Sequence, residues 1–499
     1  MPIQFANGQS STSFAIEALA RAIREAASLG GPQSEQLLAL AATLGASADW
    51  RNNYQRVFAE LSAFEFTSSE AALQRALLAA TGDLIQDSTG RSLTALVAVD
   101  SIAAAREAVV TVEVRGAGQT SALATVGAPT AEAMIEHRLA EPGVRASLSA
   151  YDDWISNHGD APTQGEVLVA IGANAELSIA PDWLAIGGRV VAVARRNKAK
   201  WANLITEARA SSGTLLVPVL ASRAAGVGVE VDSLDDAQLA ELAGLDLQDD
   251  VTEIAAWITS LATESKTDRF VVLGSVYAPG KNQILASAAQ DAVMAALSRD
   301  LPRERLVLGW LATPLDSVVR SKSRLYELEA NYKKLSVRGR IRAGFWHLFG
   351  GLKAPKAAQL EHAKLADELA VFDYSAQRQG SSYLFAKRIE RWRANAAEAD
   401  GIKTWFQVAP PAQTHSTLDY KIVRAAYRGL TRLGFTAFEA WMLRDLLCSM
   451  LIGSLKGQMQ RDDLSETAIH GGIWRLPYDP QTVWLPAAGI GWVELIRNR

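Results

Sequence analysis

A tyrosine and a lysine stand four residues apart, at Tyr383 and Lys387, where a strongly helical stretch begins. This spacing puts both side chains on one face of a helix, one turn apart. An ammonium group beside a phenol favours the phenolate and so lowers the pKa of the tyrosine. Such a tyrosine can exchange a proton with a substrate oxygen near neutral pH. The competing interpretation is an amphipathic helix with a buried tyrosine and a lysine that reaches out to water.

Composition excludes several classes of protein. The 499 residues are 49% hydrophobic and 21% charged, as in a globular protein of two or three domains. The net charge of −4 gives no indication of nucleic-acid binding. The single cysteine, Cys448, excludes a disulfide within the chain, and the six histidines show no metal-ligand spacing. No signal peptide or long apolar segment is apparent, so we expect no metal, no membrane span and a cytoplasmic location.

Residues 165–455 alternate between apolar, strand-like runs and helical segments. The strand-like runs are 166–171, 189–194, 214–220, 269–275, 305–311 and 403–409. This alternation predicts an α/β fold, a Rossmann-like doubly wound parallel sheet. The first two runs, separated by a small-residue turn and a helix, have the spacing of the first crossover of a dinucleotide-binding fold.

The residues around that crossover are candidates for cofactor binding. The turn after the first strand contains Gly172, Ala173 and Asn174, and the second strand ends in Arg195 and Arg196. Basic residues at this place can hold a 2′-phosphate, which favours NADP(H) over NAD(H). The turn keeps only one of the usual three glycines, and Glu176 adds a negative charge close by. A Rossmann-like unit that binds no nucleotide is therefore the alternative.

The segments on either side of this unit carry no catalytic constellation. Residues 1–157 are expected to form an N-terminal mixed α/β domain, largely helical, with strand-like runs at 93–99 and 107–114. We expect a structural, docking or dimerisation role for it. A linker rich in turn formers follows at 157–165, and residues 456–499 form a C-terminal extension.

The order of these elements resembles the short-chain dehydrogenase/reductase superfamily over about residues 165–455. The matching pieces are the strand and turn 167–172, the strand 190–196, the strand and loop 270–280, Tyr383 with Lys387, and Val408-Ala409-Pro410 with Thr414. The stretch 429–447 is also similar to the β-ketoacyl reductase domain of type I fatty acid synthases. In the loop after the sixth strand, Pro411 replaces the usual glycine.

The resemblance implies roles for individual residues. Tyr383 would be the general acid, and Lys387 would lower its pKa and bind the nicotinamide ribose. Pro410 and Thr414 would lie beside the nicotinamide. A serine or threonine near the end of the fifth strand would hold the substrate carbonyl; Thr313 fits this place best, with Ser317, Ser381 and Ser382 as alternatives. The family also implies a homo-oligomer as an option, because its members often pair through helices of the catalytic half.

A rival alignment remains open. If 269–275 were the fifth strand and Ser275 its serine, the next helix would be the catalytic one. Ile284 and Ala288 would then stand at the tyrosine and lysine positions, and the site would be inactive. We prefer the first alignment, because it uses Tyr383, Lys387, Pro410 and Thr414 together.

The preferred alignment requires an insertion at 314–380, long enough to fold on its own. Its part 320–356 has ten Lys or Arg against two acidic residues, with interleaved aromatic residues. This composition predicts a helical lid over the active site whose basic face suits coenzyme A, an acyl carrier protein or an anionic membrane surface. A solvated basic helix pair is the alternative.

These patterns predict an NADPH-dependent reductase that acts on a ketone, on a bulky or acyl-thioester 3-oxo substrate, with the proton supplied by Tyr383. The alternative is a non-catalytic scaffold or carrier-docking protein with a degenerate nucleotide site. A third option is a nucleotide bound for structure or redox sensing only.

Overall fold

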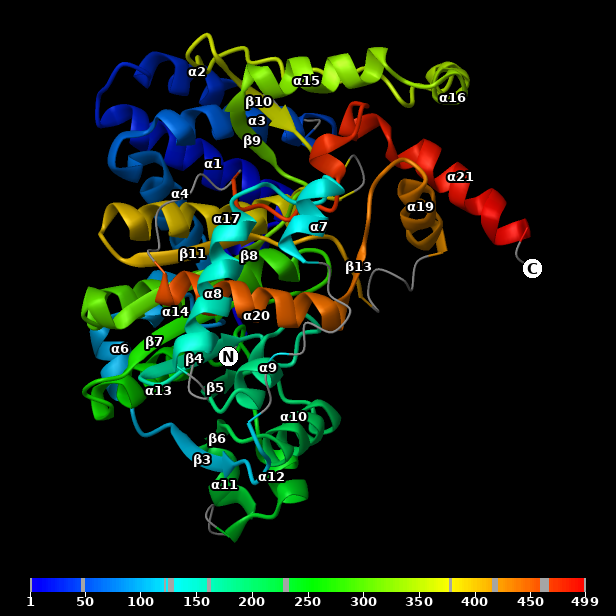
Figure 1. Cartoon of the computed structure of the whole chain (residues 1–499). Helices are drawn as coiled ribbons and strands as arrows, with labels where there is room; N and C mark the ends of the chain where they lie inside the picture. Colours follow the sequence, from blue (N-terminus) through cyan, green and yellow to red (C-terminus); the bar gives the residue numbers. More distant parts are fainter. Residues whose placement is uncertain are drawn as a thin grey trace.

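The computed structural model describes residues 2–45, 50–120, 123, 130–158, 163–227, 233–376, 379–414, 421–457 and 466–497. A sheet of seven strands in the order β11-β8-β7-β4-β5-β6-β3 lies at its centre (Figure 1). The strands are β3 (Val109–Arg115), β4 (Glu166–Ile171), β5 (Arg189–Val193), β6 (Thr214–Leu220), β7 (Arg269–Gly274), β8 (Leu306–Ala312) and β11 (Lys403–Val408). All neighbours pair in parallel except β3, which is antiparallel to β6.

The strand order confirms the predicted Rossmann-like sheet. Numbered along the chain from β4, the parallel strands lie in the order third, second, first, fourth, fifth, sixth, which is the order of dinucleotide-binding folds. All six residues of β4 are buried, as expected for a strand that is covered on both faces.

Helices cover both faces of the sheet. Alternate residues of β4 enter two different cores: Val167 and Val169 in one, Leu168 and Ala170 in the other. The first core includes α13 (Val251–Glu264), α14 (Asn282–Asp300) and α17 (Ser381–Ala399). The second includes α8 (Val144–His158), α9 (Ala180–Ala185), α10 (Lys198–Ala210), α12 (Asp236–Leu242) and α20 (Ala440–Lys456).

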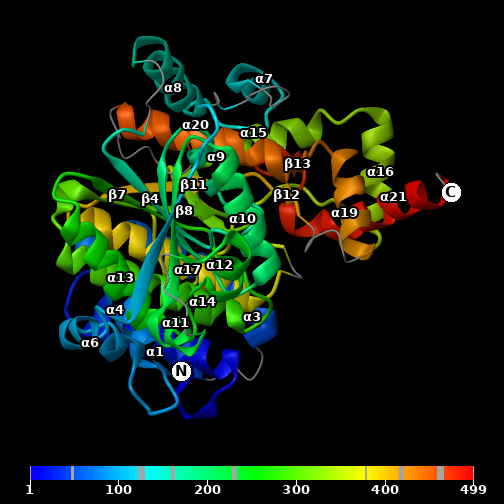
Figure 2. The ribbon, with the colours of Figure 1, turned by 90° about the horizontal axis from the view of Figure 1, so that it is seen from below.

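The N-terminal helices form a further layer over α14 and α17 (Figures 1 and 2). They are α1 (Ser11–Ser28), α2 (Ser34–Gly45), α3 (Trp50–Thr67) and α4 (Ala72–Asp83). Phe385 of α17 contacts both Phe14 of α1 and Phe58 of α3, with ring centroids 5.6 and 6.4 Å away. Residues from both sides of the linker therefore share one core, and β3 shares the sheet. The division of the chain into domains at 1–157, 165–455 and 456–499 stays a prediction.

One expected strand is wrong. Residues 93–99 form the short helices α5 (Leu93–Leu96) and α6 (Val99–Ala104), because the Ser92 side chain caps the first of them by accepting a hydrogen bond from the N–H of Ala95. Leu93 and Leu96 then bury one face at helical spacing. The strand expected at 107–114 is confirmed as β3.

The insertion starts and ends as a two-stranded antiparallel ribbon of β9 (Ser317–Ser321) and β10 (Leu369–Asp373). Between these strands lie α15 (Lys322–Lys333) and α16 (Val337–His347). Near α16 in both views lie α19 (Lys421–Thr431) and α21 (Trp484–Arg497), away from the sheet (Figures 1 and 2).

Smaller elements complete the fold. They are β1 (Gln4–Phe5), β2 (Ile85–Gln86), α7 (Ala131–Glu136), α11 (Ala221–Val227), β12 (Ala412–Gln413) and β13 (Phe438–Glu439). Across the described ranges, no helix has the length and apolarity needed to cross a membrane.

Candidate active site

Thr313, Tyr383 and Lys387 come together at the carboxyl end of the sheet. Thr313 follows directly after β8, and Tyr383 and Lys387 lie in the first two turns of α17, the helix that leads from the insertion to β11. The Thr313 hydroxyl and the Lys387 ammonium both lie close enough to the Tyr383 phenol to lower its pKa. A hydroxyl, a phenol and an ammonium thus meet at one point, as the preferred alignment requires.

Lys387 already has partners in this structure. Its Nζ donates to the carbonyl oxygen of Leu311 at 3.1 Å and to the two carboxylate oxygens of Glu390 at 2.9 and 3.2 Å. Glu390 is 2% exposed, so this is a buried ion pair on one side of α17. Glu390 is not among the residues predicted from the sequence. The signal was present: an acidic residue three positions after Lys387, next to the apolar Ile389.

The pKa of Tyr383 differs from the sequence-based expectation. Burial raises it above its usual value, and Lys387 and Thr313 offset only part of that rise. Glu390 raises it further, because a carboxylate disfavours a phenolate nearby. The phenol therefore stays protonated at neutral pH. In this form it can donate a proton, whereas it is poorly suited to accept one.

A chain of polar side chains leads from Glu390 into α14. Ser287 Oγ lies 3.4 Å from a Glu390 carboxylate oxygen, and Gln283 Nε2 lies 3.3 Å from Ser287 Oγ. Gln283 also binds the loop after β7, donating to the carbonyl oxygen of Val276 and accepting from the N–H of Ala278. Burial raises the pKa of Glu390, and the Lys387 ammonium counteracts this rise.

The alternative serines have different surroundings. Ser317 lies in the core, where its Oγ accepts from Arg388 at 2.7 Å. Ser382 lies in the first turn of α17 and is half-buried, as is Ser381. Ser275 follows β7, the fourth parallel strand, and donates to the carbonyl oxygen of Ile171 at 3.2 Å. The helix after β7 is α14, which precedes the fifth parallel strand, β8. The helix that precedes the sixth parallel strand, β11, is α17, which carries Tyr383 and Lys387. This order agrees with the preferred alignment.

Buried charges fix α17 in place. The Arg388 guanidinium, wholly buried, pairs with Glu65 of α3 at 3.0 Å and with Asp316 at 2.9 Å. It also donates to Ser62 Oγ at 2.7 Å. Asp316 lies in the turn between β8 and β9, three residues after Thr313. This cluster therefore joins α17 both to the N-terminal layer and to the segment that carries Thr313.

A second buried cluster lies on the other side of the same turn. Glu141 accepts from Arg475 at 2.6 Å and from Arg320 at 2.8 Å, and His470 lies 3.5 Å away. Trp474 donates from its indole nitrogen to the carbonyl oxygen of Pro314 at 2.8 Å. Burial alone would raise the pKa of Glu141, but contact with His470 and the two arginine charges hold it at about 2.

The turn after β4, where a nucleotide phosphate would lie in the predicted fold, is organised differently from the region around Tyr383. Gly172 has a left-handed φ of +95°, and a Cβ there would lie 3.0 Å from the Ser275 backbone, so the turn requires a glycine. The N–H groups of Gly172 and Ala173 both donate to the carbonyl oxygen of Val193, at 2.8 and 3.0 Å. The following helix, α9, has six residues and begins only at Ala180. The turn thus differs from the usual phosphate cradle, in which such N–H groups face the ligand.

Three side chains near this turn fit an anionic ligand to different degrees. Asn174 Nδ2 is buried and has no hydrogen-bond partner within the described ranges, so an acceptor such as a phosphate oxygen would satisfy it. Arg195 is exposed at the end of β5. Arg196 is already paired with Asp250, and a further carboxylate, that of Asp249, lies 4.0 Å away. We conclude that Asn174 and Arg195 fit a nucleotide phosphate, whereas Arg196 first has to leave its carboxylates.

Pro410 and Thr414 occupy the loop after β11. The N–H of Ala409 donates to the carbonyl oxygen of Ala312 at 3.0 Å, which places the start of this loop beside Thr313. Pro410 is buried there, and Thr414 follows β12 at the end of a described range. Contact of either residue with a nicotinamide stays a prediction.

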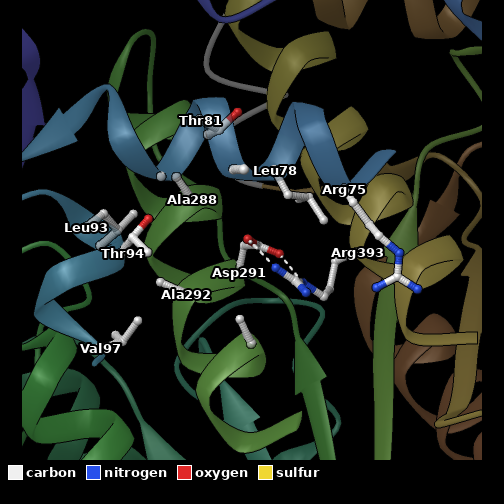
Figure 3. Close-up of a pocket in the computed structure, with 13 residues that line it drawn as sticks. Arg75, Leu78, Thr81, Leu93, Thr94, Val97, Ala288, Asp291, Ala292 and Arg393 are labelled. Atoms are coloured by element: carbon white, nitrogen blue, oxygen red, sulfur yellow. Dashed lines mark hydrogen bonds and ion pairs between the residues drawn. The ribbon is translucent and has the colours of Figure 1, made fainter. Parts of the chain in front are cut away.

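A cavity of about 230 Å³ lies away from the site, between α4–α5 and the helices α14 and α17 (Figure 3). Its charged side chains are paired: Arg393 with Asp291 at 2.6 Å, and Arg75 with Asp400 at 3.0 Å. Small and apolar side chains such as Leu78 make up most of the rest. We assign no chemistry to it. Among the residues that the structure describes, no group of His, Cys, Asp or Glu side chains could hold a metal ion.

Comparison with known proteins gives little guidance. No family model matches the chain, and no curated protein matches it. One similar solved structure is a thiolation-reductase di-domain from an archaeal non-ribosomal peptide synthetase. It is 9% identical, and the match covers 94% of this chain and 79% of that chain with a TM-score of 0.30. At so low a TM-score the likeness says nothing about function.

Proposed function

We propose that the chain is an NADP(H)-dependent reductase of ketones in which Tyr383 donates the proton. The observation that supports this most directly is the meeting of Thr313, Tyr383 and Lys387 between the fifth and sixth parallel strands of the sheet. When bound, NADP(H) supplies the hydride. Asn174 and Arg195 would hold its phosphates.

The side chains have distinct roles in this proposal. The hydroxyl of Thr313 and the phenol of Tyr383 orient the substrate carbonyl by hydrogen bonds. The Tyr383 phenol, protonated because its pKa is raised, then gives its proton to the carbonyl oxygen as that oxygen gains negative charge. Lys387 stabilises the phenolate that remains. For this it has to share its ammonium between Tyr383 and Glu390.

The substrate we propose is a bulky ketone or a 3-oxoacyl thioester of coenzyme A or a carrier protein. The ten Lys and Arg residues of 320–356 suit such acidic groups. Docking of an acyl carrier protein on this segment, its role as a lid, a homo-oligomer and a cytoplasmic location stay predictions.

A non-catalytic scaffold is the second candidate. It is favoured by the nucleotide end, where the N–H groups of Gly172 and Ala173 are used within the turn and Arg196 is paired. A protein that lost its cofactor could keep the fold of the catalytic half.

The test combines cofactor binding with turnover. We expect NADPH fluorescence to show binding, and a 3-oxoacyl-CoA to be reduced. Tyr383→Phe should lower turnover by about 100-fold to 10,000-fold and leave NADPH affinity unchanged, because only proton transfer is lost. The matched control is Tyr151→Phe, a tyrosine of α8 outside the candidate site and outside 320–356, which should keep full activity. Absence of NADPH binding at millimolar concentrations would overturn the enzyme proposal.

A further inference from the structure

The helix α16 presents apolar side chains to solvent. Val337, Ile341 and Phe345 follow one another at intervals of four residues and are 65%, 68% and 55% exposed. Leu348, just after the helix, is 81% exposed. At 100° per residue these four lie within one arc of the helix, opposite the buried Gly339 and Ala343. The helix thus packs on the protein through Gly339, Ala343 and Trp346 and leaves the four side chains of the apolar arc uncovered.

The neighbouring helices α19 and α21 also expose apolar side chains. Trp346 of α16 packs on α21, where a Cβ on Gly489 would lie 2.5 Å from its ring. The backbones of α19 and α21 touch, since a Cβ on Gly429 would lie 1.8 Å from the carbonyl oxygen of Ala487. The exposed large apolar side chains on these two helices are Ile422, Leu485, Trp492 and Val493. The three helices lie away from the sheet in both views (Figures 1 and 2).

Two of these helices, α16 and α19, carry positive charge only, whereas α21 contains one acidic residue, Glu494, and one basic residue, Arg497. Residues 330–360 contain seven Lys or Arg and no acidic residue, and residues 421–432 contain four and none. The net charge of the whole chain is −4, so this surface is opposite in sign to the protein average. On α16 itself Arg338 and Arg340 lie on the two sides of the apolar arc. An apolar face with basic flanks is the pattern of helices that lie in the interface of a membrane.

We propose that α16, together with the exposed apolar residues of α19 and α21, binds an anionic lipid surface; we call residues 330–360, 421–432 and 484–493 the basic helical face. The apolar side chains enter the headgroup region, and the basic flanks meet lipid phosphates. Phe345 and Phe349, with rings 5.5 Å apart, are side chains of the kind that favour this region. This interaction goes beyond the proposed reductase activity and does not depend on it.

Charge argues against one other occupant of this face. A second copy of the chain placed there would bring eleven further positive charges against the first eleven of 330–360 and 421–432. An acidic carrier protein would complement the positive charges of this face. The experiment therefore has to distinguish binding of a carrier protein from binding of lipid.

The experiment uses the full chain and vesicle flotation. The probes are vesicles of phosphatidylcholine and vesicles of phosphatidylcholine with phosphatidylglycerol. We expect binding to the anionic vesicles, loss of binding at high salt, and little binding to neutral vesicles. The double variant Ile341→Ser/Phe345→Ser should reduce vesicle binding by about tenfold, because it removes apolar side chains that the membrane interface would bury. Arg338→Ser/Arg340→Ser should reduce it by about 25-fold, at about fivefold for each basic residue.

The matched controls change exposed residues of the body. Leu29→Ser/Val99→Ser replaces two apolar residues that are 69% and 59% exposed, and Arg24→Ser/Arg51→Ser replaces two exposed arginines. Both should bind vesicles as the wild type does. The proposal is overturned if anionic vesicles do not bind, or if all four variants bind alike. It is also overturned if a purified acyl carrier protein is captured through Ile341 and Phe345 while vesicles are not. None of these readouts requires NADPH or turnover.

Discussion

The two halves of the carboxyl edge of the sheet differ in what holds them. At β8 and α17, side chains converge on Tyr383, and the buried Arg388 ties their helix to two other segments. At β4 and β5, the backbone donors of the turn are used internally, and Arg196 forms a partly exposed ion pair. The candidate catalytic half is thus fixed by the protein itself, whereas the candidate nucleotide half would have to rearrange around a ligand. Any loss of function is therefore expected first in cofactor affinity.

The largest expected effect concerns the buried charge that holds the catalytic half. Arg388→Met should lower the free energy of unfolding by about 3 to 5 kcal/mol, because Glu65 would stay buried without its cation and Asp316 would keep only Arg391, 3.5 Å away. Urea unfolding followed by circular dichroism measures this. The counterpart on the nucleotide half is Arg196→Met, with a loss of about 1 kcal/mol or less, since that side chain is 31% exposed. Equal losses in the two variants would contradict the contrast between the halves.

Cofactor affinity separates the two arginines at the end of β5. Arg195→Ser should weaken NADPH binding by about tenfold and leave NADH binding nearly unchanged, because it removes a charged partner of the 2′-phosphate. Arg196→Ser should have a smaller effect, since its guanidinium is engaged with Asp250. Fluorescence titration with both cofactors is the measurement. A larger effect from Arg196 would mean that its ion pair opens on binding.

The carboxylate of Glu390 provides a test within the catalytic half. Glu390→Gln removes a charge that raises the pKa of Tyr383, so that pKa should fall. Ultraviolet difference titration of the phenolate, with Tyr383→Phe as background, detects the change. The control is Glu398→Gln, further along the same helix, which should leave the titration of Tyr383 as it is. An unchanged titration in Glu390→Gln would remove Glu390 from the site.

A further expected effect is the acid sensitivity of the second buried cluster. Burial lowers the pKa of His470 to about 4 from the usual 6.5, and the pKa of Glu141 is held at about 2. For both groups the pKa in the folded protein lies below the pKa in the unfolded chain, so each contributes to the free energy of unfolding at higher pH. The contribution of His470 is complete above pH 6.5, and that of Glu141 is complete above about pH 4.5. These contributions are lost as the pH falls towards about 4 and then about 2. His470→Asn should flatten the unfolding free energy between pH 6.5 and 4.

The sequence predicted the sheet well and the site in part, for physical reasons. Strands buried on both faces must be apolar throughout, so runs such as Val167 to Ile171 identify them directly. The same rule failed at 93–99, where an apolar run starts with the helix cap Ser92. Tyr383 and Lys387 were visible because one turn of helix relates them.

The groups that set the properties of the site were harder to find. In the sequence, Arg388 is one of several charged residues of a helix, and nothing local distinguishes it from its neighbours. Its partner Glu65 lies more than 300 positions away in the sequence. The effect of burial on Tyr383 also depends on packing that no local pattern reports. The sequence therefore indicated which residues are candidates for the chemistry, while their protonation and anchoring required the three-dimensional arrangement.

The N-terminal layer over α17 has a consequence for biosynthesis. The apolar faces of α1, α3 and α4 are covered by a helix that starts at Ser381, roughly 300 residues after α4 ends at Asp83. At about 5 to 20 residues per second, a ribosome needs about 15 to 60 s to make that stretch. Throughout this interval the first helices to emerge lack the surface that buries them. A nascent chain of this protein is thus expected to engage chaperones early, and to release them only when the catalytic helix has left the ribosome.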